Sequence, residues 1–119
     1  MDYSRKLLEY SRKFSSTKYS ETLNELYDCY LRDDWKRFEL VEKKFPSDVQ
    51  LLENLIEKLK GKSVYSNLRK IFKNESVNVI DMKVTLSSLI THLLLEEKQG
   101  GREYSNLIKE THKKLGDLI

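Results

Sequence analysis

The chain has 119 residues, 34% of them charged, and its 4 Gly and 1 Pro are too few for the turns of an all-β protein. Its one cysteine, Cys29, excludes an internal disulfide and a cysteine-based zinc site. The N-terminal stretch lacks the continuous apolar core of a signal peptide, so we expect a cytoplasmic protein. Length and composition predict a single helical domain over residues 1–119.

The first three predicted helices are rich in aromatic residues. Their apolar faces recur at helical spacing, first as Tyr3, Leu7, Tyr10 and Phe14, then as Tyr19, Leu23, Leu26, Tyr27 and Tyr30, and last as Trp35, Phe38, Val41 and Phe45. The apolar residues of the last two faces follow nearly the same helical periodicity, so one long helix through to Phe45 is an alternative. We favour a break at Asp33 and Asp34, because adjacent aspartates cap helices better than they continue them.

Pro46 marks the clearest boundary, and Ser47 and Gln50 are placed as a capping box for the next helix. That fourth helix carries an apolar face and ends at Gly61. A fifth helix is predicted from its cap at Ser63 to its end at Asn74. The two apolar faces are Val49, Leu52, Leu55, Ile56 and Leu59 on the fourth helix, and Val64, Leu68, Ile71 and Phe72 on the fifth.

The most apolar stretch, residues 77–96, predicts a central helix. One face gathers Met82, Leu86, Leu89, Ile90 and Leu93, while Val84, Leu94 and Leu95 fall elsewhere, so we expect burial on several sides. Its unbroken apolar run is shorter than the ~20 residues that a bilayer requires. A last helix follows Gly100 and Gly101, with Tyr104, Leu107, Ile108, Thr111 and Leu115 on one face. The predicted fold is a compact all-α bundle of six to seven short antiparallel helices around a central helix at about 79–96.

Candidate catalytic residues are few. His92 shares one stripe of the central helix with Asp81, Thr85 and Ser88, but a catalytic triad needs convergent side chains and an oxyanion site, which one straight helix does not supply. We expect this stripe to make interhelical hydrogen bonds instead. The chain has no phosphate-binding glycine loop and no His-x-x-His spacing. We therefore predict no enzyme activity, metal, cofactor or small-molecule substrate.

Charge is strongly segregated along the chain. Residues 58–74 hold six Lys or Arg and no Asp or Glu, whereas residues 21–57 hold ten acidic residues and five basic ones. We expect the acidic span to lie on another side of the molecule. Lys62, Arg69 and Lys73 are predicted to line the outer face of the fifth helix, with Tyr65 and Asn67 beside them to contact bases. The hypothetical nucleic-acid contacts are Arg5, Arg12, Lys58, Lys62, Arg69, Lys70 and Lys73; a merely solvated basic face is the alternative.

Two stretches resemble known families. The run LRDDWKRFELVEKKFPSD is similar to the turn and second helix of a tetratricopeptide hairpin, although no 34-residue repeat recurs. SNLRKIF and GGREYSNLIKE, on either side of a leucine-rich helix, resemble the small helical subunits of type III CRISPR complexes.

The sequence favours a non-catalytic small subunit or adaptor in a nucleic-acid-associated assembly. The alternative is a pure protein–protein module, such as a viral or immunity-type inhibitor, because the first 45 residues are dense in aromatic side chains. Most of these side chains are expected in the core, and an exposed strip among them would bind a protein partner. No membrane association is expected.

Overall fold

The computed structural model describes residues 2–119, and the regular elements in that range are all helices. This confirms the all-α prediction of six to seven helices. The elements are α1 (Tyr3–Lys13), η1 (Thr17–Tyr19), α2 (Ser20–Leu31), α3 (Trp35–Glu42), α4 (Asp48–Leu59), η2 (Ser63–Tyr65), α5 (Leu68–Phe72), α6 (Val79–Lys98) and α7 (Ser105–Gly116), where η denotes a 3-10 helix.

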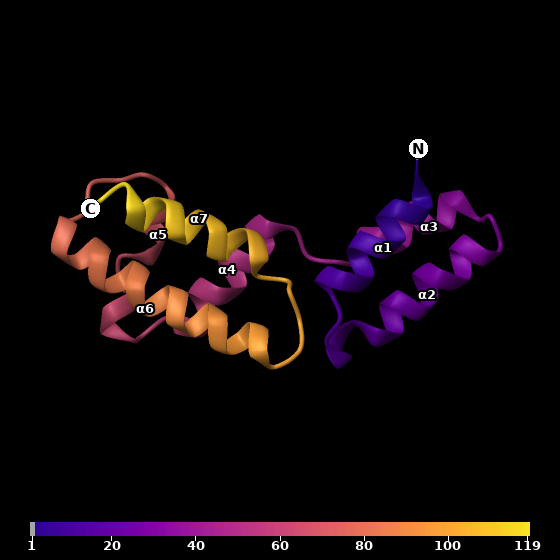
Figure 1. Ribbon diagram of the computed structural model, residues 1–119, viewed down its shortest axis with the longest axis horizontal. Coiled ribbons are helices and arrows are strands. Elements are labelled where there is room, and N and C mark those ends of the chain that lie inside the picture. Colours follow the sequence, from indigo (N-terminus) through magenta and orange to yellow (C-terminus); the bar gives the residue numbers. More distant parts are fainter. Residues whose placement is uncertain (1) are drawn as a thin grey trace.

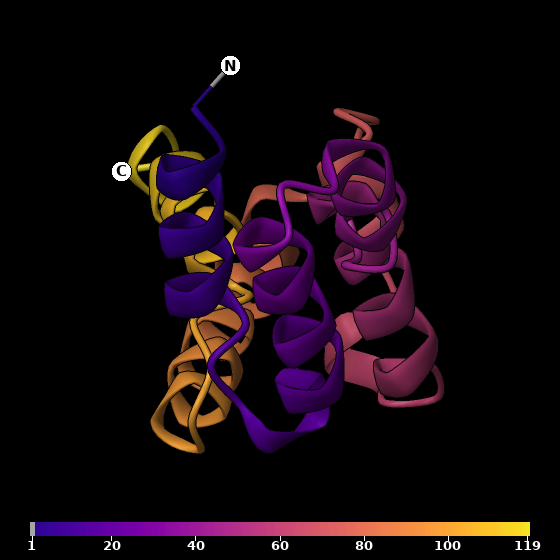
Figure 2. The same cartoon turned by 90° about the vertical axis from the view of Figure 1, so that its right-hand side faces the viewer.

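The molecule is elongated, measuring 53 × 26 × 20 Å, and its helices form two groups (Figure 1). Helices α1 to α3 lie at one end of the long axis and α4 to α7 at the other, and the view along this axis shows the first group in front of the second (Figure 2). Each group has its own buried cluster. The N-terminal core comprises Phe14, Tyr19, Leu26, Cys29, Phe38, Val41 and Phe45, and the C-terminal core comprises Leu51, Leu55, Leu59, Leu68, Leu89, Leu93, Leu107 and Ile108.

Aromatic stacking holds the N-terminal core together. The rings of Phe14 and Phe45 stack with centroids 4.5 Å apart, and those of Tyr3 and Trp35 stack at 4.3 Å. Stacked aromatic pairs add roughly 0.5–1.5 kcal/mol to the effect of burial. Most of the aromatic residues in this half therefore belong to the core, as predicted. The prediction that Tyr27 belongs to the buried face of the second helix is wrong. Tyr27 is 53% exposed, and Cys29 is buried instead.

The predicted break between the second and third helices is confirmed. Asp33 adopts a positive φ of 53°, which a continuous α-helix does not allow. The carboxylate of Asp34 then caps α3 by accepting a hydrogen bond from the Arg37 amide at 3.3 Å. The chain therefore reverses here, and α3 packs back against α2.

Helix α4 begins and ends as predicted, but its buried face is rotated. The Ser47 hydroxyl accepts from the Gln50 amide at 3.2 Å, and Gly61 ends the helix with φ of 92°. The Gln50 side chain donates to Asn54 instead of returning to Ser47, so only half of the capping box forms. Val49 is 73% exposed and Leu51 is buried, so the buried face contains Leu51 in place of Val49.

The predicted fifth helix is wrong in its first half. The chain forms the 3-10 turn η2, and α5 then spans only Leu68–Phe72 before Asn74 ends it, as expected, at φ of 58°. Ser63, Ser66 and Asn67 crowd this segment, and such residues compete with the backbone for hydrogen bonds inside a helix. As a result, Lys62 precedes a turn and does not share a helical face with Arg69.

Helix α6 is the centre of the C-terminal half, but only one of its faces is buried. Leu86, Leu89 and Leu93 are 0% exposed, where α7 and η2 pack against the helix. Val84, Leu94 and Leu95 are 51%, 44% and 55% exposed, so the prediction of burial on several sides is wrong. Within residues 2–119 we find no helix with the length and hydropathy of a membrane span.

The two halves meet at the loop between α6 and α7. The Arg102 amide donates to the Lys13 carbonyl at 3.0 Å, and the Ser15 hydroxyl donates to the Gly100 carbonyl at 2.9 Å. The Tyr19 hydroxyl donates to the Glu103 carboxylate, and burial together with this bond raises the pKa of Tyr19. These bonds tie the end of α1, the segment that follows it and the end of η1 to the C-terminal half.

Substitution of Leu89 by Asp should unfold the protein. The side chain is 0% exposed, and a carboxylate there would be buried without a partner, at a cost above about 4 kcal/mol. Thermal unfolding followed by circular dichroism in dilute solution checks this. The matched control, Leu95→Asp on the exposed face of α6, should stay within about 0.5 kcal/mol of the parent. A cooperative transition of Leu89→Asp near that of the parent would contradict the assignment.

Substitution of Tyr19 by Phe should lower the free energy of unfolding by about 1.5 kcal/mol, because a hydrogen bond to a charged group is lost and the ring is kept. Urea denaturation measures the change. Tyr27→Phe, at an exposed hydroxyl, is the control and should change little. Equal stability of the two variants would contradict the prediction, because it would show that the Tyr19 bond adds nothing to the free energy of unfolding.

Candidate polyanion-binding site

Four basic side chains converge on one hollow of the C-terminal half. This hollow, which we call the basic hollow, has a volume of about 450 Å³ and lies between the end of α4 and the η2–α5 segment. Its basic lining residues are Lys60, Lys62, Arg69 and Lys70. Ile56, Leu59 and Tyr65 give it a mainly apolar floor, and the remaining lining residues are Glu57, Gly61, Ser63 and Ser66.

The backbone of the basic hollow is fixed by a turn and by two anchors on α6. Gly61 takes the left-handed conformation that reverses the chain, and the Tyr65 amide donates to the Lys62 carbonyl at 2.9 Å. The Thr85 hydroxyl donates to the Val64 carbonyl at 2.7 Å, and the Tyr65 hydroxyl donates to the Ser88 carbonyl at 3.2 Å. The Thr85 bond confirms the prediction that the polar stripe makes hydrogen bonds to neighbouring elements, and the two bonds together fix η2 against α6.

Carboxylates of α4 neutralise half of the hollow. Arg69 pairs with Glu53 at 3.1 Å, and Lys60 pairs with Glu57 at 3.7 Å. The expectation that the acidic span lies on another side of the molecule is therefore wrong for α4, which carries both glutamates alongside the basic segment. It holds for the part of the span in α2 and α3, which lies in the N-terminal half (Figure 1). Lys62 and Lys70 have no ion-pair partner among the described residues, and both are exposed. The positive charge of the hollow comes mainly from these two lysines.

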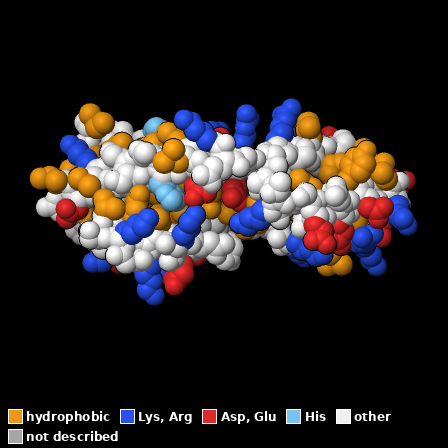
Figure 3. Space-filling view, turned by 90° about the horizontal axis from the view of Figure 1, so that it is seen from below, with side chains coloured by type: hydrophobic (Ala, Val, Ile, Leu, Met, Phe, Trp, Pro, Cys, Tyr) orange, Lys and Arg blue, Asp and Glu red, His pale blue; other side chains and the backbone are white. Residues whose placement is uncertain are grey.

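The other predicted contact residues lie outside the basic hollow. Lys58 pairs with Glu96 at 2.8 Å, and Lys73 is exposed beyond the end of α5. Arg5 pairs with Glu9 at 3.5 Å on α1, which lies in the other half of the molecule (Figure 1). On the face shown in Figure 3, Lys and Arg side chains are spread over both halves, with acidic side chains between them. No single basic surface unites all seven predicted residues.

Arg12 lies at the junction of the two halves. It lines a small hollow of about 210 Å³ together with Lys13 and Arg102, and Glu9 is also part of the lining. Nothing in the sequence relates Arg102 to Arg12, because only the packing of the loop after α6 against α1 brings them together. Lys60, which belongs to the basic run over residues 58–74, lines the basic hollow instead.

Tyr65 and Asn67 do not form an exposed platform for bases. The Tyr65 ring packs against the C-terminal core, and its hydroxyl is bonded to Ser88. Stacking on a nucleobase needs a free aromatic face. The geometry of the basic hollow therefore suits phosphate groups more than bases.

His92 is half-buried beside the basic hollow. Its Nε2 atom is 3.6 Å from the Glu96 carboxylate, just beyond hydrogen-bond distance, and its ring meets Tyr65 edge to face at 6.5 Å. Burial lowers the pKa of His92, against the opposing effect of Glu96. The neutral imidazole is therefore the favoured form in the folded protein. Among residues 2–119 we find no cluster of His, Cys, Asp and Glu suited to a metal ion.

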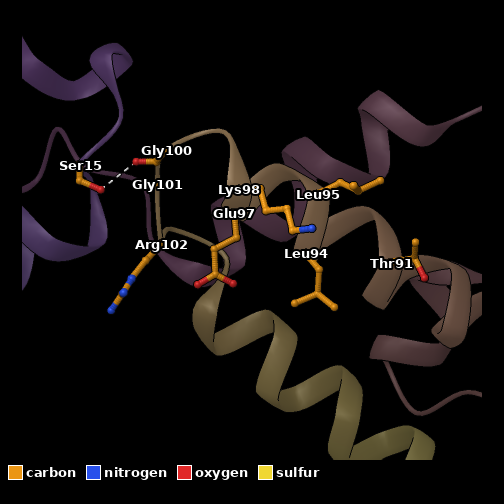
Figure 4. Close-up of a pocket in the computed structure, with 9 residues that line it drawn as sticks. All are labelled: Ser15, Thr91, Leu94, Leu95, Glu97, Lys98, Gly100, Gly101 and Arg102. Carbon is orange, nitrogen blue, oxygen red and sulfur yellow. Dashed lines mark hydrogen bonds between the residues drawn. The ribbon is translucent and has the colours of Figure 1, made fainter.

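A larger hollow, of about 620 Å³, lies where α6 meets the loop to α7 (Figure 4). Leu94, Leu95 and Lys98 line it from α6, and Gly101 and Arg102 line it from the loop. In Figure 4 the Lys98 side chain extends back along the helix toward the two leucines. This hollow is mainly apolar and was not anticipated from the sequence.

The lowered pKa of His92 predicts a pH-dependent contribution to stability. Because the unfolded chain binds a proton at the ordinary histidine pKa of 6.5 and the folded chain binds it only at lower pH, stability should fall as pH decreases from about 7 to about 5. Melting temperatures of the parent and of His92→Phe across this range check the effect. The melting temperature of His92→Phe should lack the part of this fall that His92 causes. Melting temperatures of the two proteins that fall in parallel with decreasing pH would contradict the prediction.

Comparison with known proteins identifies no relative of this chain. No protein-family model matches it, and neither a curated protein nor a solved structure does so. The likenesses to tetratricopeptide hairpins and to small CRISPR subunits thus stand on short stretches of sequence alone. What the chain does is inferred below from its own charges, hollows and exposed faces.

Proposed function

We propose that this chain is a non-catalytic helical adaptor that docks onto the phosphate backbone of nucleic acid through the basic hollow. The observation that carries this proposal is the pair of lysines, Lys62 and Lys70, which face one hollow without a carboxylate partner in the described chain. Unpaired lysines near each other repel, and an anion between them removes that repulsion. Lysine ammonium groups bind phosphate as point charges without demanding one geometry.

Other groups of the hollow support phosphate as the ligand. Ser63 and Ser66 contribute hydroxyl groups, which donate hydrogen bonds to phosphate oxygens, and Gly61 has no side chain to block a close approach. Arg69 also lines the hollow and is paired with Glu53. It adds to the positive potential of the hollow, but the ion pair restricts the movement of its side chain. With no free aromatic ring for stacking, we expect weak binding that depends on charge and ignores sequence.

The proposal of a non-catalytic role is supported by the environment of His92. Its neighbours are Glu96, which is already paired with Lys58, and the Tyr65 ring. Of the two hydroxyl groups on the same stripe, that of Thr85 donates to the Val64 carbonyl. The Ser88 hydroxyl makes no hydrogen bond to His92, whose Nε2 atom has no hydrogen-bond partner among the described residues. A nucleophile with an activating base needs a direct hydrogen bond between the two groups, which this arrangement does not provide.

Docking onto another protein is a second candidate function. A groove of about 420 Å³ between α1 and α2 is lined mainly by apolar residues, among them Leu7, Leu8, Leu23 and Tyr27. Leu8 and Tyr27 are 50% and 53% exposed, and Leu31 at the end of α2 is 64% exposed. An exposed apolar groove between two helices accepts the apolar face of a partner helix.

The nucleic-acid proposal predicts salt-dependent binding that Lys62→Glu/Lys70→Glu abolishes. Fluorescence anisotropy with a labelled single-stranded RNA, across a salt series, measures both affinity and its salt dependence. The double variant should bind at least about tenfold more weakly, and the slope of log K against log salt should fall by about 1.4, which is about 0.7 for each lost phosphate contact.

Lys109→Glu/Lys113→Glu provides the matched control, because it makes the same change of charge on exposed positions of α7. This control should lose far less affinity than the hollow variant. Equal losses would show that only net charge matters. Absence of binding at low salt to both single-stranded RNA and duplex DNA would defeat the proposal and leave protein docking as the better candidate.

A further inference from the structure

One face of α6, opposite the face that packs on the C-terminal core, carries an uncovered row of apolar and small side chains. We call this row the α6 seam; it comprises Ile80, Val84, Ser87, Thr91, Leu94 and Lys98. Ile80, Val84 and Leu94 are 70%, 51% and 44% exposed, and Leu95 beside them is 55% exposed. Figure 3 shows exposed hydrophobic side chains along this half of the molecule.

The spacing of the α6 seam is that of a helix–helix contact. Successive members are separated by four, three, four, three and four residues, the alternation that keeps a row facing a partner helix. The two residues in the middle of the seam, Ser87 and Thr91, have small side chains. The Thr91 hydroxyl donates to the Ser87 carbonyl at 3.2 Å, which satisfies it within the helix and leaves the methyl group for contact.

We propose that a second copy of this chain covers the α6 seam, with the two α6 helices antiparallel about a two-fold axis. The register that aligns the seams places Val84 opposite Leu94 of the second copy and Ser87 opposite Thr91 of the second copy. The two-fold symmetry repeats each contact, so the small residues lie at the centre and the larger apolar residues on both sides. Antiparallel helices also oppose their dipoles.

Charge complementarity selects this partner and this direction. In the antiparallel register, Lys83 flanks the seam opposite Glu97 of the second copy, and symmetry forms the pair twice. Neither Lys83 nor Glu97 has an ion-pair partner within the part of the chain that the structure describes. A parallel arrangement would instead set Lys83 against Ser88 of the second copy, so the pair with Glu97 would not form.

The hollow at the C-terminal end of α6 fits the same register. Ile80, the most exposed apolar member of the seam, falls opposite Lys98 of the second copy, at the hollow of about 620 Å³ lined by Leu94, Leu95 and Lys98 (Figure 4). A branched apolar side chain would thus enter a mainly apolar hollow. Sliding one helix by seven residues in either direction separates Lys83 from Glu97 and leaves Leu94 or Ile80 without a facing helix.

Sedimentation equilibrium of the full chain, from micromolar to millimolar concentration, tests the proposal. The parent should show a monomer–dimer equilibrium, and Val84→Glu should raise the dissociation constant at least about tenfold by placing a charge in the seam. Leu8→Glu is the matched control, since Leu8 is also half exposed but lies in the α1–α2 groove. It should leave the dimer unchanged, and circular dichroism should show both variants folded.

A charge swap tests the register. Lys83→Glu and Glu97→Lys should each weaken the dimer about tenfold, whereas the double variant Lys83→Glu/Glu97→Lys should restore an affinity close to the parent's, because both pairs re-form with reversed sign. A parent that stays monomeric at millimolar concentration overturns the proposal. A dimer that persists in Val84→Glu, dissociates in Leu8→Glu, or is not restored by the double swap overturns it as well.

Discussion

One-sided burial of α6 organises the C-terminal half of the molecule. Leu86, Leu89 and Leu93 are completely buried against α7 and η2, and hydrophobic burial on this scale is the dominant favourable contribution to folding. The same helix anchors η2 through two hydrogen bonds. The Thr85 hydroxyl donates to the Val64 carbonyl, and the Ser88 carbonyl accepts from the Tyr65 hydroxyl. The basic hollow exists because this turn is held in place. The opposite face, which no described element covers, remains available for a partner.

The loop from Gly100 to Glu103 connects the two halves of the molecule by hydrogen bonds. Each half has its own core. Polar contacts join the two halves, among them the ion pair of Lys13 on α1 with Asp48 on α4 at 3.0 Å. The bonds from Arg102 to Lys13, from Ser15 to Gly100 and from Tyr19 to Glu103 all involve this loop or its flanks. It also forms one wall of the hollow of about 620 Å³, so the position of the N-terminal half and the shape of the α6 face depend on the same few residues.

Charge in this protein is balanced locally rather than by region. The acidic helix α4 runs beside the basic segment, and Glu53, Glu57 and Glu96 of the α4–α6 half neutralise Arg69, Lys60 and Lys58. Such exposed pairs contribute little to stability, about 0–1 kcal/mol each. Their larger effect is to leave only three lysines of the basic run without an ion pair among the described residues: Lys62, Lys70 and Lys73. Of these, Lys62 and Lys70 line the basic hollow, which concentrates the proposed anion site at these two residues.

The sequence alone determined the features that depend on neighbouring residues in the chain. Caps at Asp34 and Ser47, and ends at Gly61 and Asn74, follow from side-chain oxygens and from backbone conformations that few residues adopt, so they were predicted correctly. Tertiary structure alone decided which apolar faces are covered, because Val84 and Leu94 are as hydrophobic as buried residues and only packing leaves them exposed. It also decided the carboxylate neighbours of each lysine, since Glu53 and Arg69 are far apart in sequence and meet only when α4 and α5 pack.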